Sequence, residues 1–293
     1  MDEYTKSHGL GNDYLVMDGA KLSFPLTEAA VRLICHRNFG VGSDGILLLV
    51  PTTRADYGLR IFNPDGSEAE KSGNGLRIFA KFLGEHGHAA RDRFTIDTKG
   101  GVVTAELLRR GSRVESVKVD MGQATFVSDE IPVIGPRREV VQEEIAVSGE
   151  RLKYTAVSVG NPHCVVLVDA LRHDDIMRLG PLLERHANFP NRINVQFARV
   201  EARDTVSILI WERGAGYTLA SGSSSCAVAS ACVKNGLVDG HVTVKSPGGE
   251  LSIDVAPDWS IRLQGPVVES CSGQLSAELL DQIRAGYLPP GLA

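Results

Sequence analysis

The chain repeats itself at a nearly constant interval, and this repeat constrains the fold more than any other feature. Gly11-Asn12 recurs as Gly160-Asn161, and Ser72-Gly73 recurs as Ser221-Gly222, each pair 149 residues apart. Four further matches keep the same order at offsets of 148 to 150: residues 38–39 with 188–189, 59–62 with 208–211, 63 with 212, and 98–101 with 246–249. One match alone is trivial, but an ordered series indicates an internal duplication. Two copies are too few for a solenoid and predict a pair of related domains.

The duplication predicts an α+β protein with two pseudo-symmetric domains. Residues 1–122 form the first, residues 123–265 the second, and residues 266–293 a C-terminal tail. We expect the tail either to pack on the first domain or to mediate a homodimer. Most of each copy has the β-rich, alternating pattern of strands, whereas residues 75–83 and 224–233 are apolar nearly all round and predict buried helices. Each domain is therefore expected to be an antiparallel, barrel-like sheet around one central helix.

Composition excludes several classes of protein. The chain has 293 residues, of which 43% are hydrophobic and 23% charged, as in ordinary globular proteins. Its net charge of −5 provides no basic excess for nucleic acid. No apolar run approaches the ~20 residues that span a bilayer, and the acidic N-terminus lacks a leader pattern. The five cysteines lack CxxC pairs or zinc spacing, so we expect reduced thiols, no metal, no membrane partner and a cytoplasmic location.

Both predicted central helices begin at small polar residues and glycine. The segments are Ser72-Gly73-Asn74 and Ser221-Gly222-Ser223. A helix N-terminus leaves about four backbone N–H groups unpaired and carries partial positive charge, so it suits a small anion such as a carboxylate. The simpler alternative is that these residues only cap their helices. Their recurrence in both copies favours a ligand shared by the two helix starts.

Other repeated positions carry polar side chains suited to a small zwitterion. Arg213 can hold a carboxylate through two hydrogen bonds, and Glu212 can hold an ammonium group. Asparagine amides can satisfy either group, and four of them occur at turns or strand ends: Asn12, Asn63, Asn161 and Asn194. Structural roles in turns are the alternative for some of them. Together these residues predict a site for a small zwitterion such as an amino acid, and the chain has no GxxxxGK loop and no dinucleotide fingerprint.

At these residues the chain resembles the diaminopimelate epimerase family. The motifs follow in family order through almost the whole sequence: HGLGND at 8–13, FNPDGSE at 62–68, SGNG at 72–75, GNPHC at 160–164, RINV at 192–195 and ERGAG at 212–216. The resemblance implies two pseudo-symmetric β-barrels, each around a central helix, with the substrate between them. It also implies an isomerase of lysine biosynthesis that works without a cofactor.

The resemblance further implies a two-base mechanism and a set of site residues. In the family one cysteine thiolate removes the α-proton and a second cysteine, on the opposite face, returns one. Backbone groups of Gly73-Asn74 and Gly222-Ser223 would bind the α-carboxylate. The distal end of the substrate would be held by Asn12, Asn63, Asn161, Asn194, Glu212 and Arg213.

Serine occupies both positions of the family's catalytic cysteines, at Ser72 and Ser221. A thiol has a pKa near 8.5, whereas an alcohol is closer to water at ~15.7, a difference worth on the order of 10 kcal/mol against forming the base. Two helix dipoles at up to ~2 kcal/mol each do not offset this cost. Cys226 does not replace the missing thiol, because the family carries a cysteine there too. Lys71 and Tyr217 are two smaller departures from the family pattern.

Three interpretations of the serines follow. In the first, the chain is an isomerase that uses other groups for proton transfer, with Lys71 and His163 as candidates and the serines as relays. In the second, the serines are engineered to trap substrate, which Lys71 and Tyr217 fit poorly. In the third, the fold supports lyase or tautomerase chemistry or binding alone. We favour an amino-acid isomerase, with the conversion of LL- to meso-diaminopimelate as the first candidate.

Overall fold

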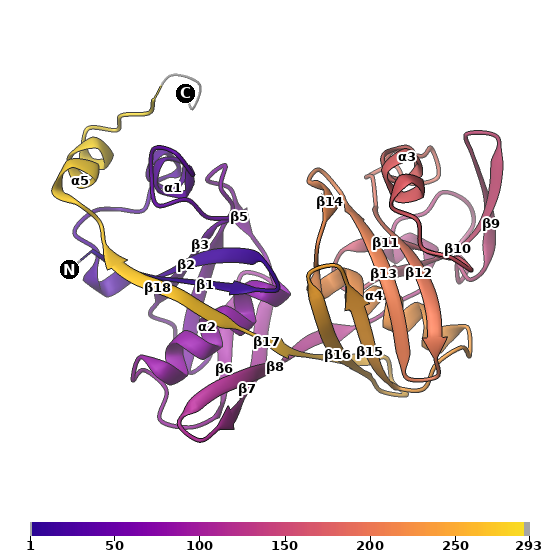
Figure 1. The fold of residues 1–293 in the computed structure, drawn as a ribbon, viewed down its shortest axis with the longest axis horizontal. Helices are drawn as coiled ribbons and strands as arrows, with labels where there is room; N and C mark the ends of the chain where they lie inside the picture. Colours follow the sequence, from indigo (N-terminus) through magenta and orange to yellow (C-terminus); the bar gives the residue numbers. More distant parts are fainter. Residues whose placement is uncertain (1, 290–293) are drawn as a thin grey trace. The chain divides into compact units, whose positions relative to one another are not determined.

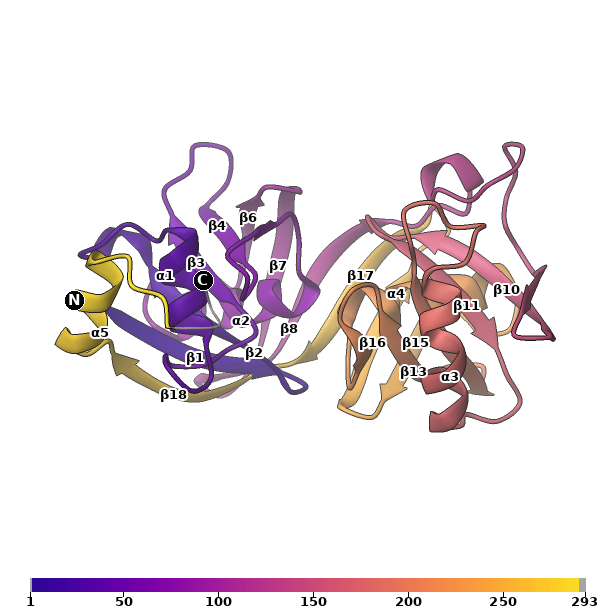
Figure 2. The ribbon, with the colours of Figure 1, turned by 90° about the horizontal axis from the view of Figure 1, so that it is seen from above.

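The computed structural model describes residues 2–289 as an α+β protein that divides into two compact units (Figures 1 and 2). Within these residues, unit 1 comprises residues 2–119 and 266–289, and unit 2 comprises Asp120–Gly265. The predicted α+β class with a duplicated architecture is confirmed.

Unit 1 contains nine strands and four helical segments among the described residues. The strands are β1 (Glu3–Gly9), β2 (Asn12–Asp18), β3 (Ile46–Val50), β4 (Tyr57–Phe62), β5 (Glu68–Ala69), β6 (Arg93–Thr98), β7 (Gly101–Arg110), β8 (Arg113–Gln123, whose end continues into unit 2) and β18 (Val268–Gln274). The helices are α1 (Glu28–Cys35), α2 (Gly73–Glu85), α5 (Ala277–Arg284) and the short 3-10 helix η1 (Gly19–Lys21).

Unit 2 repeats this series of elements. Its strands are β9 (Glu143–Val147), β10 (Glu150–Ser158), β11 (Pro162–Leu167), β12 (Asn194–Ala202), β13 (Thr205–Glu212), β14 (Gly216–Thr218), β15 (His241–Ser246), β16 (Gly249–Val255) and β17 (Ser260–Pro266). Its helices are α3 (His173–Glu184), α4 (Gly222–Lys234) and the 3-10 helix η2 (Ser128–Glu130). The order of elements from β1 to β8 therefore matches the order from β10 to β17.

Strand pairing is also the same in both units. In unit 1 the strands follow the order β18-β1-β2-β3-β4-β6-β7-β8, and in unit 2 the order β9-β10-β11-β12-β13-β15-β16-β17. Two pairs in each unit are parallel: β2–β3 and β4–β6 in unit 1, and β11–β12 and β13–β15 in unit 2. The sequence predicted antiparallel sheets, because alternation of polar and apolar residues does not report strand direction. Each parallel pair is joined by a crossover that contains a helix, as parallel strands require.

The central helices α2 and α4 lie against the strands of their own units (Figure 1). In α2, the side chains of Leu76, Ile78 and Phe79 are completely buried. In α4, nearly every residue from Gly222 to Cys232 is buried, and most of them are small. Small side chains allow a helix to be surrounded by sheet without voids or overpacking. The helices predicted at 75–83 and 224–233 are therefore observed, with the expected burial on all sides.

The C-terminal segment up to residue 289 is part of unit 1. Strand β18 pairs with β1, with Gln274 opposite Glu3. Leu280 and Ile283 of α5 join the hydrophobic cluster that contains Ile34 of α1. The longest helices of residues 2–289, α2 and α4, have 13 residues each, and no helix in this part of the chain could cross a membrane.

Candidate active site

Each central helix begins at a serine that caps it. The backbone of Ser72 and Ser221 is extended, with φ of −140° and −150°. Oγ of Ser72 accepts a hydrogen bond from the N–H of Gly75 at 3.0 Å, and Oγ of Ser221 accepts one from the N–H of Ser224 at 3.5 Å. Each cap satisfies one of the N–H groups that a helix start leaves unpaired. Capping and ligand binding are compatible, because each hydroxyl still has its own proton to donate.

Polar side chains from several elements of unit 1 surround the start of α2. The hydroxyl of Tyr14, on β2, lies 3.3 Å from Oγ of Ser72. Nδ2 of Asn74 donates to Oδ1 of Asn12 at 3.1 Å, and Nδ2 of Asn12 donates to the Asp44 carboxylate at 2.9 Å. The structure therefore brings four predicted site residues, Asn12, Ser72, Gly73 and Asn74, to one helix start.

A buried arginine fixes this arrangement from inside the helix. Arg77 is completely buried, and its guanidinium donates to the carbonyl of Gly73 at 3.2 Å and to Oδ1 of Asn74 at 2.6 Å. Because Oδ1 of Asn74 accepts from Arg77, Nδ2 of Asn74 is oriented to donate to Asn12. The positive charge one turn into α2 also adds to the positive potential of the helix start, which favours a bound carboxylate.

Asn63 lies in the tight turn between β4 and β5. Its Nδ2 donates to Oγ of Ser67 at 2.9 Å, and its backbone N–H donates to the Ser67 carbonyl at 2.8 Å. Asp65 in turn accepts from the N–H and hydroxyl of Ser67. These contacts give Asn63 a structural role in the turn. Its contact with substrate stays a prediction.

The start of α4 in unit 2 has a different set of partners. Nδ2 of Asn161 donates to Oγ of Ser223 at 3.4 Å, and Oγ of Ser223 lies 3.5 Å from Oγ of Ser221. Gly222 is buried between the two serines. Four predicted site residues of unit 2, Asn161, Ser221, Gly222 and Ser223, therefore lie together at this helix start.

His163 is held in a neutral state by its surroundings. Its Nε2 lies 2.9 Å from Oδ1 of Asn161, and its Nδ1 accepts from Nε2 of Gln196 at 3.0 Å. The same Gln196 amide donates to Oγ of Ser224 at 2.9 Å. Complete burial lowers the pKa of His163 to about 3. A ring whose two nitrogens are both engaged and that resists protonation is a poor base, which argues against the role considered for His163 from the sequence.

Glu212, the last residue of β13, lies beside Ser221 at the start of α4. Burial raises the pKa of this half-buried carboxyl above its ordinary value, and a hydrogen bond from the Ser221 hydroxyl partly offsets that rise. The family resemblance implied that Glu212 would hold the distal end of the substrate. Within unit 2 the structure places it beside Ser221, where a carboxylate with a raised pKa can accept a proton.

A buried carboxylate shapes the turn that follows Glu212. Both oxygens of Glu184, at the end of α3, accept hydrogen bonds: from the N–H of Gly214 at 3.1 Å, the indole N–H of Trp211 at 2.8 Å and the guanidinium of Arg192 at 3.2 Å. Arg192 has a left-handed φ of 58°, which is uncommon for a residue other than glycine. Glu184 thus holds three segments of unit 2 together.

Two asparagines complete this turn around Arg213. Oδ1 of Asn194 accepts from the backbone N–H of Arg213 at 2.9 Å, while Nδ2 of Asn194 donates to the Pro162 carbonyl at 2.9 Å. The Arg213 guanidinium donates to the Asn191 carbonyl at 3.0 Å and is otherwise exposed. Asn194 and Arg213 therefore lie together, with the charged end of Arg213 accessible to a ligand.

Replacing the buried Glu184 should destabilise unit 2. We expect Glu184→Ala to lower the free energy of unfolding by about 2 to 4 kcal/mol, since the Trp211 indole and the Gly214 N–H would lose a charged acceptor. Urea denaturation measures this change. Glu144→Ala, which removes an exposed carboxylate 3.4 Å from Arg151, is the matched control and should change stability by less than ~1 kcal/mol. Equal effects of the two variants would contradict the role given to Glu184.

The cysteines do not replace the missing thiols. The five cysteines lie within residues 2–289 and form no disulfide, and four of them, Cys35, Cys164, Cys226 and Cys232, are buried. Burial raises the pKa of Cys35 to about 11 and that of Cys232 to about 12, and it raises the pKa of Cys164 further. Since the thiolate is the reactive form, these are structural thiols. Residues 2–289 also contain no cluster of three or more His, Cys, Asp or Glu side chains able to hold a metal ion.

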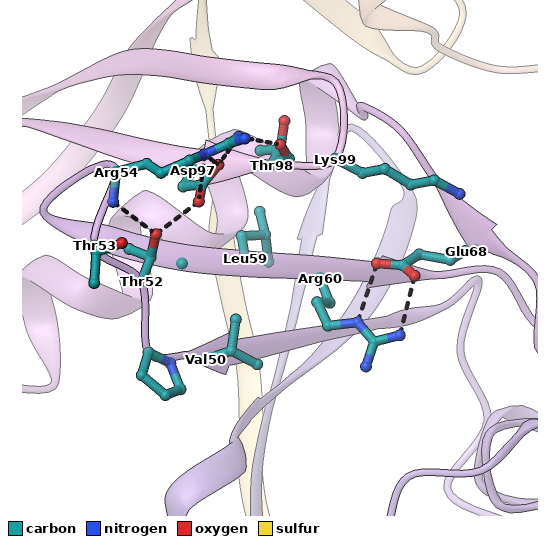
Figure 3. Close-up of a pocket in the computed structure, with 12 residues that line it drawn as sticks. Val50, Thr52, Thr53, Arg54, Leu59, Arg60, Glu68, Asp97, Thr98 and Lys99 are labelled. Atoms are coloured by element: carbon teal, nitrogen blue, oxygen red, sulfur yellow. Dashed lines mark hydrogen bonds and ion pairs between the residues drawn. The ribbon is translucent and has the colours of Figure 1, made fainter.

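A groove on unit 1 lies outside the predicted site (Figure 3). It has a volume of about 580 Å³, and its lining includes Arg54, Arg60 and Lys99. Arg60 makes two hydrogen bonds to Glu68, at 3.0 and 3.1 Å, and Arg54 pairs with Asp97. Two of the three cations are thus neutralised within the groove itself. None of the predicted site residues lines it.

Sequence reasoning missed four residues that shape the candidate site: Tyr14, Arg77 and Gln196 at the helix starts, and Glu184 at the turn after β13. The repeat could have identified Tyr14, which stands 149 residues before His163. Glu184 and Gln196 occur among apolar residues of a helix and a strand, and a buried polar group there must find partners. A polar residue within an apolar run was therefore the available signal for both.

Comparisons with known proteins agree with this arrangement. The sequence model described as diaminopimelate epimerase matches residues 4–127 and 155–268. Diaminopimelate epimerase 2 of Nostoc sp. (strain PCC 7120) is 49% identical over 278 residues, covering 94% of this chain and 96% of that protein. Diaminopimelate epimerase of Desulfitobacterium hafniense is 40% identical over 281 residues, covering 95% and 99%.

Solved structures share the fold at low sequence identity. A probable proline racemase from Agrobacterium radiobacter K84 matches with a TM-score of 0.71 and 18% identity, covering 98% of this chain and 96% of the other. A hydroxyproline epimerase from Agrobacterium vitis matches with a TM-score of 0.69 and 17% identity, covering 99% and 95%.

Duplicated units with a capped central helix in each, together with these relatives, place the protein among the amino-acid racemases and epimerases, a class of isomerases. Within that class, the chain belongs to the diaminopimelate epimerase family. The resemblance inferred from the sequence motifs is thereby confirmed.

Proposed function

We propose that this protein inverts the α-carbon of an amino acid without a cofactor, and that diaminopimelate is its first candidate substrate. The observation that carries the proposal is the matched pair of helix starts, each with a serine cap, an adjacent glycine and a hydrogen-bonded asparagine. Both starts would act on one amino acid, with the backbones of Gly73-Asn74 and Gly222-Ser223 binding its α-carboxylate. The names of the relatives support diaminopimelate as the substrate.

The distal end of the substrate would contact the remaining polar residues. Arg213 presents an exposed guanidinium that can bind a carboxylate through two hydrogen bonds. Asn12, Asn63, Asn161 and Asn194 would orient the ammonium and carboxylate groups of that end. Diaminopimelate fits this set, because its distal end is itself an amino acid with both charges.

Proton transfer in unit 2 would use Ser221 and Glu212 together. The α-carbon–hydrogen bond breaks, its electron pair stays on carbon, and the proton passes to Oγ of Ser221. As it does so, the Ser221 hydroxyl proton moves to the neighbouring Glu212 carboxylate. No free alkoxide forms, so the cost of ionising an alcohol is avoided, and the raised pKa of Glu212 makes it the better acceptor.

Chiral chromatography of reaction mixtures tests the proposed activity. Purified protein incubated with LL-diaminopimelate should produce the meso form, and the meso form should produce the LL form. Unchanged stereochemistry with every amino acid of a broad panel would contradict the proposal. Loss of water from the substrate would instead indicate a lyase.

The Arg213 side chain should matter for substrate affinity and not for the stability of the fold. We expect Arg213→Ala to weaken diaminopimelate binding by about 10²-fold or more, since a charge-assisted pair is lost. Isothermal titration calorimetry measures the affinity, and the melting temperature should stay unchanged because the side chain is exposed. Arg199→Ala, which removes an arginine of β12 paired with Glu201, is the control. Intact affinity in Arg213→Ala would remove Arg213 from the site.

Location and assembly form the last part of the proposal. Cysteines without disulfide bonds, one of them the exposed Cys271, suit a reducing compartment, so we place the enzyme in the cytoplasm. The homodimer considered from the sequence is tested by analytical ultracentrifugation, in which a single species of monomer mass would contradict it.

A further inference from the structure

We infer that Tyr14 is a proton-transfer partner of Ser72. Tyr14 supplies a proton to the Ser72 hydroxyl, or accepts one from it, when Ser72 exchanges a proton with the α-carbon of the substrate. The inference rests on the proposed function, because it assigns the group that makes the serine of unit 1 usable in an epimerase. It concerns a residue that acts through Ser72 and is therefore a positioning and relay residue.

The geometry places the phenol directly against the serine. The Tyr14 hydroxyl lies 3.3 Å from Oγ of Ser72, which also accepts from the Gly75 N–H at 3.0 Å. With one lone pair engaged by the cap, Oγ can accept from Tyr14 while pointing its own proton elsewhere. Tyr14 is 6% exposed, so most of its ring is packed within unit 1.

A glycine fixes the position of the Tyr14 ring. A Cβ placed on Gly45 would lie 2.7 Å from Cε1 of Tyr14 and 2.4 Å from the carbonyl of Phe62. Gly45 has a φ of 155° and precedes β3, which pairs with β2. The absence of a side chain at residue 45 therefore creates the space in which the ring packs. In the second copy the corresponding residue is Asn194, which holds Arg213 instead.

Among the described residues, an ionisable side chain lies beside each serine, and the two come from different positions of the repeat. Tyr14 corresponds to His163, which is bonded to Asn161 and Gln196 and kept neutral. Glu212 corresponds to Asn63, whose amide cannot ionise. Thus Ser221 is served by a carboxyl from the end of β13, whereas Ser72 is served by a phenol from β2. The two copies have diverged at both positions in complementary ways.

The chemistry balances as a two-proton relay. When unit 1 returns a proton, the Ser72 O–H bond breaks toward the carbanion at the α-carbon, whose electron pair forms the new C–H bond. The Tyr14 proton moves to Oγ of Ser72 at the same time and leaves a phenolate, which water reprotonates. The opposite direction runs the same steps in reverse. A phenol of pKa near 10 loses its proton roughly 5 × 10⁵-fold more readily than an alcohol near 15.7.

The test removes only the phenol oxygen. Tyr14→Phe should lower kcat by about 10² to 10⁴-fold and leave KM for diaminopimelate nearly unchanged. Tyr57→Phe is the matched control in the same unit, because its hydroxyl bonds only the His88 carbonyl among the described contacts. The decisive readout is a double variant. A thiol at residue 72 ionises without help, so in a Ser72→Cys background Tyr14→Phe should change kcat by less than ~3-fold.

The outcomes separate this inference from the proposed function. If the unsubstituted protein inverts no amino acid, the proposed function fails and this inference fails with it. If that protein is active and Tyr14→Phe stays within ~3-fold of it, only the inference is overturned. A loss of equal size in both backgrounds would indicate a structural role and would also overturn it.

A second variant protects the test against misfolding. A fluorinated tyrosine at residue 14 keeps the ring and its hydrogen bond while strengthening the phenol as an acid. In the direction in which unit 1 returns the proton, it should raise the initial rate. An initial rate unchanged within ~2-fold in a variant of normal melting temperature would overturn the inference.

Discussion

The double variant Ser72→Cys/Ser221→Cys is expected to epimerise diaminopimelate at least ~10³-fold faster than the unsubstituted protein. A cysteine at a helix start can be tuned to ionise near neutral pH, whereas an alcohol there needs a partner to take up its proton. The helix starts and the buried Arg77 are already in place to favour a negative charge. Initial rates from chiral chromatography at saturating substrate measure the change.

The control for this variant is another capped helix. Ser276 is the N-cap of α5 and accepts from the N–H of Leu279 at 3.2 Å, so Ser276→Cys makes the same change at a helix start outside the site. It should leave the rate unchanged. If the double variant is no faster than the Ser276→Cys control, the helix starts do not act on the α-carbon of this substrate.

Glu212→Gln should lower kcat by about 10² to 10⁴-fold while making the protein more stable at neutral pH. The loss of rate follows because an amide cannot accept the proton that Ser221 passes on. The gain in stability follows from the raised pKa of Glu212, since its burial makes the ionised form costly in the folded protein. Glutamine keeps an oxygen for the Ser221 hydroxyl and carries no charge.

The pH dependence of this stability gain has a definite sign. Below the ordinary glutamate pKa of about 4.3, Glu212 is protonated in both the folded and unfolded protein and costs nothing. As pH rises from there to the higher pKa of the folded protein, the unfolded chain releases this proton while the folded protein still holds it, so stability falls and the loss is complete above the folded pKa. The Glu212→Gln variant should thus have the same melting temperature as the unsubstituted protein near pH 4. At pH 7 its melting temperature should be up to about 3 °C higher.

Thermal unfolding at the two pH values, with Glu144→Gln as the exposed control, checks this prediction. The control should show the same melting temperature as the unsubstituted protein at pH 7. A Glu212→Gln variant that retains full activity would remove Glu212 from proton transfer. A Glu212→Gln variant that is less stable than the unsubstituted protein at pH 7 would contradict the claim that burying the ionised Glu212 side chain destabilises the folded protein.

Most of the predictions made from the sequence were based on the internal duplication. Matches such as Ser72 with Ser221 established two related domains, and the fully apolar stretches identified both central helices. Strand direction was out of reach: β1 alternates between buried and more exposed residues, whereas β2 and β3 are largely continuous buried runs, and a short buried run does not by itself specify a parallel partner. Parallel pairing depends on where a crossover helix returns the chain, which is a property of the tertiary fold.

Residue types at the helix starts were predictable, but their partners were not. Asn12 and Asn74 were both recognised as polar positions, yet their mutual hydrogen bond depends on Arg77, whose burial inside α2 no local pattern reveals. Glu212 was expected to contact the distal end of a substrate, and only the packing of β13 against the start of α4 places it beside Ser221. Motifs therefore identified the residues, and tertiary packing determined the hydrogen bonds between them.

Single-turnover epimerisation in heavy water tests the central claim, that each unit contributes one proton-transfer group to the same α-carbon. LL-diaminopimelate is mixed with an excess of protein, and proton NMR with mass spectrometry follows deuterium at the α-carbons of substrate and product. We predict one deuterium at the inverted centre of the meso product and little deuterium in the recovered LL substrate. Product that retains the original hydrogen, or substrate that exchanges without inversion, would contradict the account.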